Sequence, residues 1–124
     1  MAHLVDSSVW AALFLEKDSQ HAKATHKIKR QRGTTYVPYC VANETATVLA
    51  YKHSKEQANR FLSFIENARD IEIVEDNFQE EVAFYKKLNT RISFTDTVLI
   101  LLSQKLGAEL VTFDKQLERL AKRF

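Results

Sequence analysis

Apolar residues in this chain occur in short runs typical of strands and in longer stretches with the period of a helix. The short runs are apolar or β-branched, and they predict four strands: His3–Asp6, Thr34–Val37, Ile71–Val74 and Glu109–Thr112. In the longer stretches apolar residues recur three and four positions apart, which predicts helices. They cover roughly 8–16, 18–30, 40–53, 55–68, 77–88 and 93–106, with a last helix through Leu117 and Leu120.

Strands and helices alternate along the chain, and several connections contain two helices. This order is typical of a parallel sheet that is covered by helices on both faces. We therefore predict an α/β fold, a three-layer α/β/α sandwich around a four-stranded parallel sheet. A length of 124 residues fits one domain that spans 1–124.

Three helices carry more specific expectations. The segment Val98–Leu102 is apolar nearly all round, so its helix is expected to be buried on several sides and to end at Gly107. The first helix has Ser7 or Ser8 available as its N-cap. The fifth is expected to turn its apolar residues inward: Phe78, Val82 and Tyr85.

Composition narrows the class of protein. A hydrophobic content of 45% with only 2 Gly and 1 Pro is typical of a folded domain. No apolar run reaches the roughly 18 residues of a membrane span, and the first fifteen residues contain Asp6 and lack a basic segment, unlike a signal peptide. The single cysteine, Cys40, excludes an internal disulfide and a cysteine-cluster metal site. We expect a cytoplasmic protein.

The net charge is only +2, but basic residues crowd the segment from Lys23 to Arg32. Such clusters can follow a phosphate backbone, so Lys27, Lys29 and Arg30 are a weak prediction for nucleic-acid binding. More commonly a basic cluster is the solvated face of a surface helix.

Four carboxylates are predicted to converge at one edge of the sheet. Asp6 and Asp114 each follow the end of a predicted strand, and Glu44 is placed in the first turn of the helix after the second strand. Asp96 is placed in the first turn of the buried helix that leads to the fourth strand. Ligands of parallel α/β sheets bind beyond the carboxyl ends of the strands, which is where these side chains are expected.

Each acid could instead cap a helix or meet its dipole. For the four acids taken together, capping alone is the weaker interpretation, because Asp96 precedes an unusually apolar helix, where an unpaired charge is costly. Like charges held close must raise a pKa or recruit a counter-charge, and a divalent cation resolves the conflict. Oxygen ligands without His or Cys favour Mg²⁺ or Mn²⁺. The residues predict a carboxylate-lined metal site.

Four segments also resemble the PIN domain, in particular the small stand-alone VapC toxins of VapBC toxin–antitoxin pairs. They are Leu4–Trp10, Asn43–Thr45, Ser93–Thr97 and Leu110–Asp114. The resemblance implies an α/β/α sandwich with metal-dependent ribonuclease activity. It assigns the catalytic and metal-binding roles to Asp6, Glu44, Asp96 and Asp114, and it implies supporting hydroxyls at Ser7 and Thr112.

The same resemblance implies an RNA substrate, a homodimer and a cognate antitoxin protein. Relatives usually carry a further short strand after the last helix, whereas this sequence stops at Phe124. Either that edge strand is absent or another molecule covers the edge.

Water activated on the metal is the predicted nucleophile, because the sequence offers no convincing Ser–His–Asp set. Two alternatives stay open. One is a metal-dependent phosphatase or DNA nuclease on the same scaffold, since a fold does not fix its substrate. The other is an inactive PIN-like binding module whose acids only cap helices.

Overall fold

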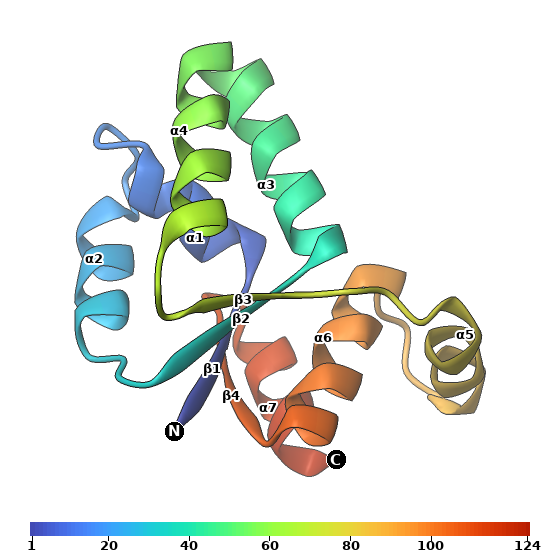
Figure 1. Ribbon diagram of the computed structural model, residues 1–124. Helices are drawn as coiled ribbons and strands as arrows, with labels where there is room; N and C mark the ends of the chain where they lie inside the picture. The colour runs from blue at the N-terminus through green and yellow to red at the C-terminus, as the bar shows by residue number, and fades with distance from the viewer.

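The computed structural model describes all residues from Met1 to Phe124. Its four strands form one parallel sheet in the order β3-β2-β1-β4 (Figure 1). Their bounds are β1 (Ala2–Val5), β2 (Thr34–Pro38), β3 (Ile71–Val74) and β4 (Ala108–Val111). The predicted fold class and strand count are confirmed.

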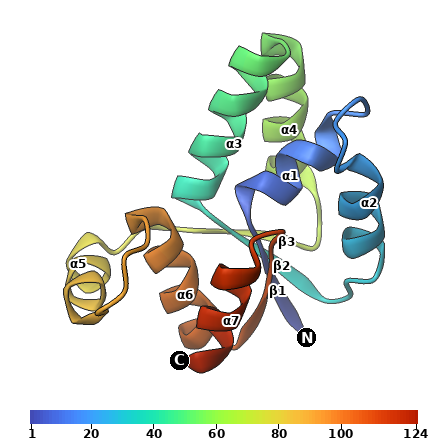
Figure 2. The same ribbon diagram turned by 180° about the vertical axis from the view of Figure 1, so that it is seen from behind.

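Helices cover both faces of this sheet. They are α1 (Ser7–Phe14), α2 (His21–Lys29), α3 (Tyr39–Lys52), α4 (Lys55–Asn67), α5 (Phe78–Lys87), α6 (Phe94–Leu106) and α7 (Lys115–Arg123). Helices α1 to α4 gather on one side, whereas α6 and α7 lie on the other and α5 sits beside α6 (Figures 1 and 2). None of the helices combines the length and apolar character that crossing a membrane requires.

The order of the strands determines where a ligand site can form. From β1 the chain moves outward to β2 and β3, and it then returns across the sheet to place β4 on the other side of β1. The direction of winding therefore reverses between β1 and β4. In open parallel sheets a crevice opens at such a reversal, beyond the carboxyl ends of the two strands.

The core lies between the sheet and the helices on each face. Leu4 and Val5 of β1 are fully buried. Phe61 of α4 and Leu99 of α6, which come from opposite sides of the sheet, are also fully buried and belong to the same apolar cluster. Helix α6 buries five of its residues, as its apolar sequence predicts, and it ends at Gly107 in a left-handed conformation with φ of 61°. A residue without Cβ adopts this conformation at little cost.

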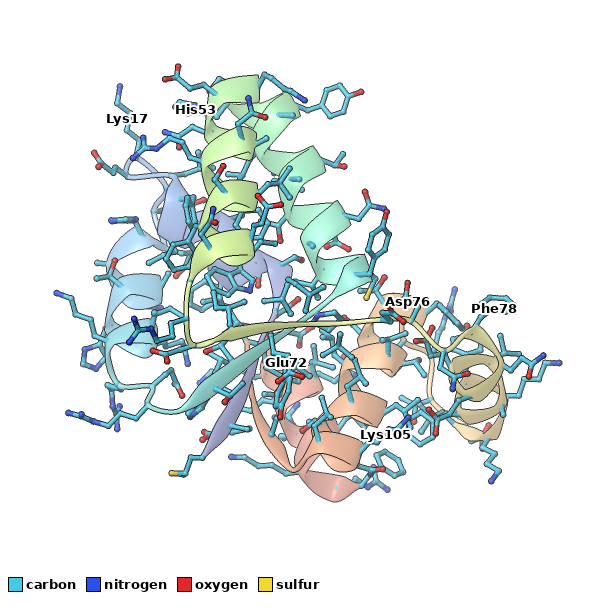
Figure 3. All side chains as sticks on the ribbon, in the orientation of Figure 1. Lys17, His53, Glu72, Asp76, Phe78 and Lys105 are labelled. Atoms are coloured by element: carbon cyan, nitrogen blue, oxygen red, sulfur yellow. The ribbon has the colours of Figure 1, made fainter.

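The prediction that Phe78, Val82 and Tyr85 form the inner face of α5 is wrong for two of these residues, since only Val82 is half-buried. Phe78 is 70% exposed and Tyr85 is 41% exposed, and Figure 3 shows Phe78 at the outer margin of the molecule. The two rings pack against Phe94 of α6, at centroid distances of 6.3 and 5.5 Å, because α5 lies at the periphery and not over the sheet. The buried side chain of α5 is Glu81, whose carboxylate accepts a hydrogen bond from Asn77 N at the start of the helix.

Candidate carboxylate site

Asp6 lies at the point where β1 ends and α1 begins. Its backbone N–H donates to Val111 O at 2.9 Å, so the pairing of β1 with β4 continues to this residue. Its Oδ1 accepts from Ser7 N at 2.7 Å and caps α1. The helix is therefore capped by Asp6 and not by Ser7 or Ser8 as expected, because the turn brings the carboxylate onto the first free amide.

Thr112 connects the two aspartates that follow neighbouring strands. Its hydroxyl donates to Asp6 Oδ2 at 2.9 Å and accepts from Asp114 N at 3.0 Å, and the side chain is 1% exposed. Asp114 in turn caps α7, since its Oδ1 accepts from the backbone amides of Gln116 and Leu117. One buried hydroxyl thus joins the carboxylate of Asp6 to the backbone of Asp114.

Ser7 makes the equivalent connection to α3. Its Oγ donates to Glu44 Oε1 at 2.6 Å and lies 3.5 Å from Asp6 Oδ1. Glu44 is the sixth residue of α3, so its predicted place in the first turn is wrong: the helix begins at Tyr39, directly after Pro38. The second turn of α3 still brings the carboxylate to the predicted edge, where it accepts the hydrogen bond from Ser7.

Asp96 enters the site from α6, as the third residue of that helix. The N-cap Ser93 accepts a hydrogen bond from Asp96 N at 3.0 Å. The negative charges of Asp6, Asp114 and Glu44 all act on its carboxylate. All four predicted acids therefore lie at one edge of the sheet, near enough for the other three to act on Asp96 through their charge, together with the two predicted hydroxyls of Ser7 and Thr112.

Burial and the nearby negative charges make ionisation of Asp6 and Asp96 unfavourable. Burial raises the pKa of Asp6 above its usual value, hydrogen bonds from Thr112, Ser7 and Ser8 oppose the rise, and the charge of Glu44 adds to it. Burial also raises the pKa of Asp96, and the charges of the other three acids raise it further. Neither ion pair of the protein involves these acids, since the pairs are Lys105–Glu80 and Lys122–Glu118.

The donor set fits a hard divalent cation in type and charge. It offers carboxylate and hydroxyl oxygens, and the repulsion among the acids has no counter-charge from the chain. As the side chains lie, no three His, Cys, Asp or Glu residues form a ready metal cluster. Glu44 and Asp114 are exposed, and each has one carboxylate oxygen without a hydrogen bond from the chain, so these two oxygens are available to an ion near Asp6 and Asp96.

Two further hydroxyls belong to the site and were not predicted for it. Ser8 Oγ donates to Asp6 Oδ2 at 3.3 Å, and a hydrogen bond from the side chain of Ser93 lowers the pKa of Asp96. In the sequence, only their position indicates this role, since each lies within three residues of one of the acids. A pocket of about 320 Å³ adjoins the acids, with Ser7, Ser8, Glu44 and Phe113 in its lining.

The basic cluster of α2 lies apart from the acids. Lys27 and Arg30 line a different pocket, which includes Met1 and none of the four acids. Lys29 is exposed on the same helix. A role for these three residues in nucleic-acid binding stays a prediction.

The raised pKa of Asp96 has a consequence for stability. A carboxyl whose pKa is higher in the folded state stabilises the fold while it is protonated, and this stabilisation is lost as the pH rises through the raised pKa. In EDTA at pH 7, Asp96→Asn should therefore raise the Tm by roughly 2–4 °C, whereas Asp70→Asn, at an exposed position, should leave it unchanged. Below the usual aspartate pKa of about 3.9 the gain should vanish. Thermal denaturation that shows Asp96→Asn to be less stable at pH 7 would contradict the unfavourable electrostatics.

Comparison with known proteins places this arrangement in a family. The model of the PIN domain matches residues 3–123. A search of curated protein sequences finds no match.

The fold is similar to two solved structures. One is Mycobacterium tuberculosis VapC20, a toxin that cleaves the sarcin–ricin loop: the TM-score is 0.83, the identity is 20%, and the match covers 96% of this chain and 94% of that one. The other is VapBC2 of Rickettsia felis, bound to a DNA fragment from its promoter: the TM-score is 0.70, the identity is 14%, and the coverage is 97% and 93%. At these identities the likeness shows a shared fold. Because the family match extends over nearly the whole chain, this protein belongs to the PIN domain family.

Proposed function

We propose that this PIN domain is a ribonuclease that hydrolyses RNA phosphodiester bonds with the help of Mg²⁺ or Mn²⁺. One observation carries the proposal: carboxylates from four distant segments meet beyond the ends of β1 and β4 without a positive partner. A packing role alone does not account for this arrangement, because the mutual repulsion of ionised acids opposes folding.

Asp6 and Asp96 would hold the ion, and the exposed carboxylates of Glu44 and Asp114 would complete its ligands or orient a water molecule. When bound, a divalent ion lowers the pKa of a coordinated water and neutralises the charge that develops on the phosphoryl group. The carboxylates of the chain thus supply the negative charge that attracts the ion and the geometry that positions it.

Two hydroxyls act on this reaction through the acids that they hold. Thr112 fixes Oδ2 of Asp6, and Ser7 fixes Oε1 of Glu44, so each limits the rotation of a carboxylate. Cys40, which lies in a pocket beside Glu44, is unsuited to act as a nucleophile. Its pKa is raised to about 12, mainly by burial, so it remains a neutral thiol. This leaves water as the nucleophile.

A cleavage assay tests the proposal. Labelled single-stranded RNA and an RNA hairpin with a sarcin–ricin loop should be cut in Mg²⁺ or Mn²⁺ and left intact in EDTA. Asp6→Asn and Asp96→Asn should each lower the rate by about 100-fold or more, since a lost transition-state contact costs about 10²–10³ in rate. The matched variant Asp70→Asn, at an exposed position outside the site, should cut at the normal rate.

The other substrate classes serve as comparisons in the same assay. Preferred cleavage of DNA or of a chromogenic phosphate ester would contradict the choice of RNA. If nothing is cut and neither ion raises the Tm of the protein, the reading of an inactive binding module replaces the enzyme.

Thr112 offers a test of the positioning role. Thr112→Val removes the hydroxyl that holds Asp6 and Asp114 and keeps the shape of the side chain, so the affinity for Mn²⁺ should fall by about 10- to 100-fold. Thr112→Ser restores a hydroxyl and should restore most of the affinity. Calorimetric titration measures both. Equal affinities for the Val and Ser variants would show that the hydroxyl has no such role.

We further propose that the protein is the toxin of a VapBC-type pair, acting in the cytoplasm as a homodimer whose antitoxin covers the acids. The family match and the similarity to the two VapC-containing structures support this reading. Expression should arrest growth in a manner that depends on Asp6, and the product of a neighbouring small open reading frame should relieve the arrest. Growth without arrest would remove the toxin role and leave the nuclease to its own assay.

A further inference from the structure

Strand β4 has a free edge. It pairs with β1 alone and ends the sheet opposite β3, with α7 beside it (Figure 1). Val111 O accepts from Asp6 N on the β1 side, and the polar main-chain groups of successive strand residues alternate in direction. The N–H and C=O of Leu110 therefore face away from β1. Such an edge is a template for another strand.

Two pockets adjoin this edge. A pocket of about 410 Å³ extends from the end of α2 across the edge to α7, and one of about 150 Å³ lies beside α6 and α7. They share four residues at the edge itself: Glu109, Leu110, Glu118 and Lys122. Because successive side chains of a strand point to opposite faces, a strand added beside β4 would place its side chains alternately in the two pockets.

The lining of the larger pocket is mainly basic, so it suits acidic side chains. Lys27, Arg30 and Arg32 line it, and with the shared Lys122 they outnumber the two glutamates of the edge. His3 also lines it, is only 4% exposed, and leaves its Nδ1 without a hydrogen-bond partner. The excess of positive charge is complementary to carboxylates.

The smaller pocket suits small apolar side chains. Ala108, Leu110 and Ala121 form its apolar lining, beside Ser103 and the three charged residues that it shares with the larger pocket. A cavity of this volume in other proteins admits a group of the size of benzene. One branched aliphatic side chain therefore suits it.

We propose that the groove formed by the β4 edge and its two pockets binds an extended segment of a partner polypeptide. The segment adds to the sheet as a strand, with acidic residues toward α2 and small apolar residues toward α7. None of Asp6, Glu44, Asp96 and Asp114 lines either pocket, so this surface is separate from the proposed ribonuclease site. A polypeptide suits the groove better than RNA does, because the unpaired main chain of Leu110 matches a peptide backbone.

Nuclear magnetic resonance with short peptides tests the proposal on the whole protein. A peptide that alternates Glu with Val should shift the amide signals of β4, slow the hydrogen exchange of Leu110 N–H, and bind more weakly as salt is added. A peptide that alternates Lys with Val should not bind. A peptide that alternates Glu with Pro has the same charge and cannot pair as a strand, so it should bind at least tenfold more weakly.

Charge reversal on α2 supplies a matched pair of variants. Arg30→Glu, at the C-cap of α2, should weaken binding of the Glu–Val peptide by at least tenfold, whereas Lys29→Glu, exposed at the preceding position and outside the pocket, should have little effect. Ala121→Leu fills the smaller pocket and should also weaken binding. Three results would each overturn the proposal: no binding of the Glu–Val peptide, equal binding of the Glu–Pro peptide, or signals of β4 that respond to single-stranded RNA and not to peptide.

Discussion

The hydrogen bond from Thr112 to Asp6 joins residues that are 106 positions apart, and the site depends on it. It can form only because β1 and β4 run parallel in a register that pairs Val5 with Val111. The residues that follow the two strands then share one edge of the sheet. The return of the chain from β3 across to β4 creates the crevice, and the hydroxyl of Thr112 joins the carboxylate of Asp6 to the backbone at the start of α7 there.

Capping a helix and serving a reaction are compatible roles for these acids. Asp114 uses Oδ1 for both of its capping hydrogen bonds, which leaves Oδ2 for another partner. Asp6 caps α1 with Oδ1 and receives the hydroxyls of Thr112 and Ser8 on Oδ2. The caps orient the carboxylates, while burial and mutual repulsion keep their charge unfavourable. The fold thus holds in place a group of charges that an added cation would stabilise.

The order of the elements follows from local signals in the sequence, which is why the fold class could be predicted. That the four acids share one edge could also be predicted, because Asp6 and Asp114 follow parallel strands and Glu44 and Asp96 lie near the starts of helices. What could not be predicted depends on tertiary contacts. The hydrogen bond from Ser7 to Glu44 joins α1 to α3, and the exposed rings of Phe78 and Tyr85 reflect the peripheral place of α5, which an amphipathic pattern does not reveal.

The central claim is that the acids at this edge bind a divalent ion in common. Anomalous diffraction from crystals soaked in Mn²⁺ locates such an ion directly. We expect one peak, from an ion that the carboxylates of Asp6 and Asp96 both ligate, with Glu44 or Asp114 turned toward it. A peak elsewhere on the protein, or none at this edge at saturating Mn²⁺, would contradict it.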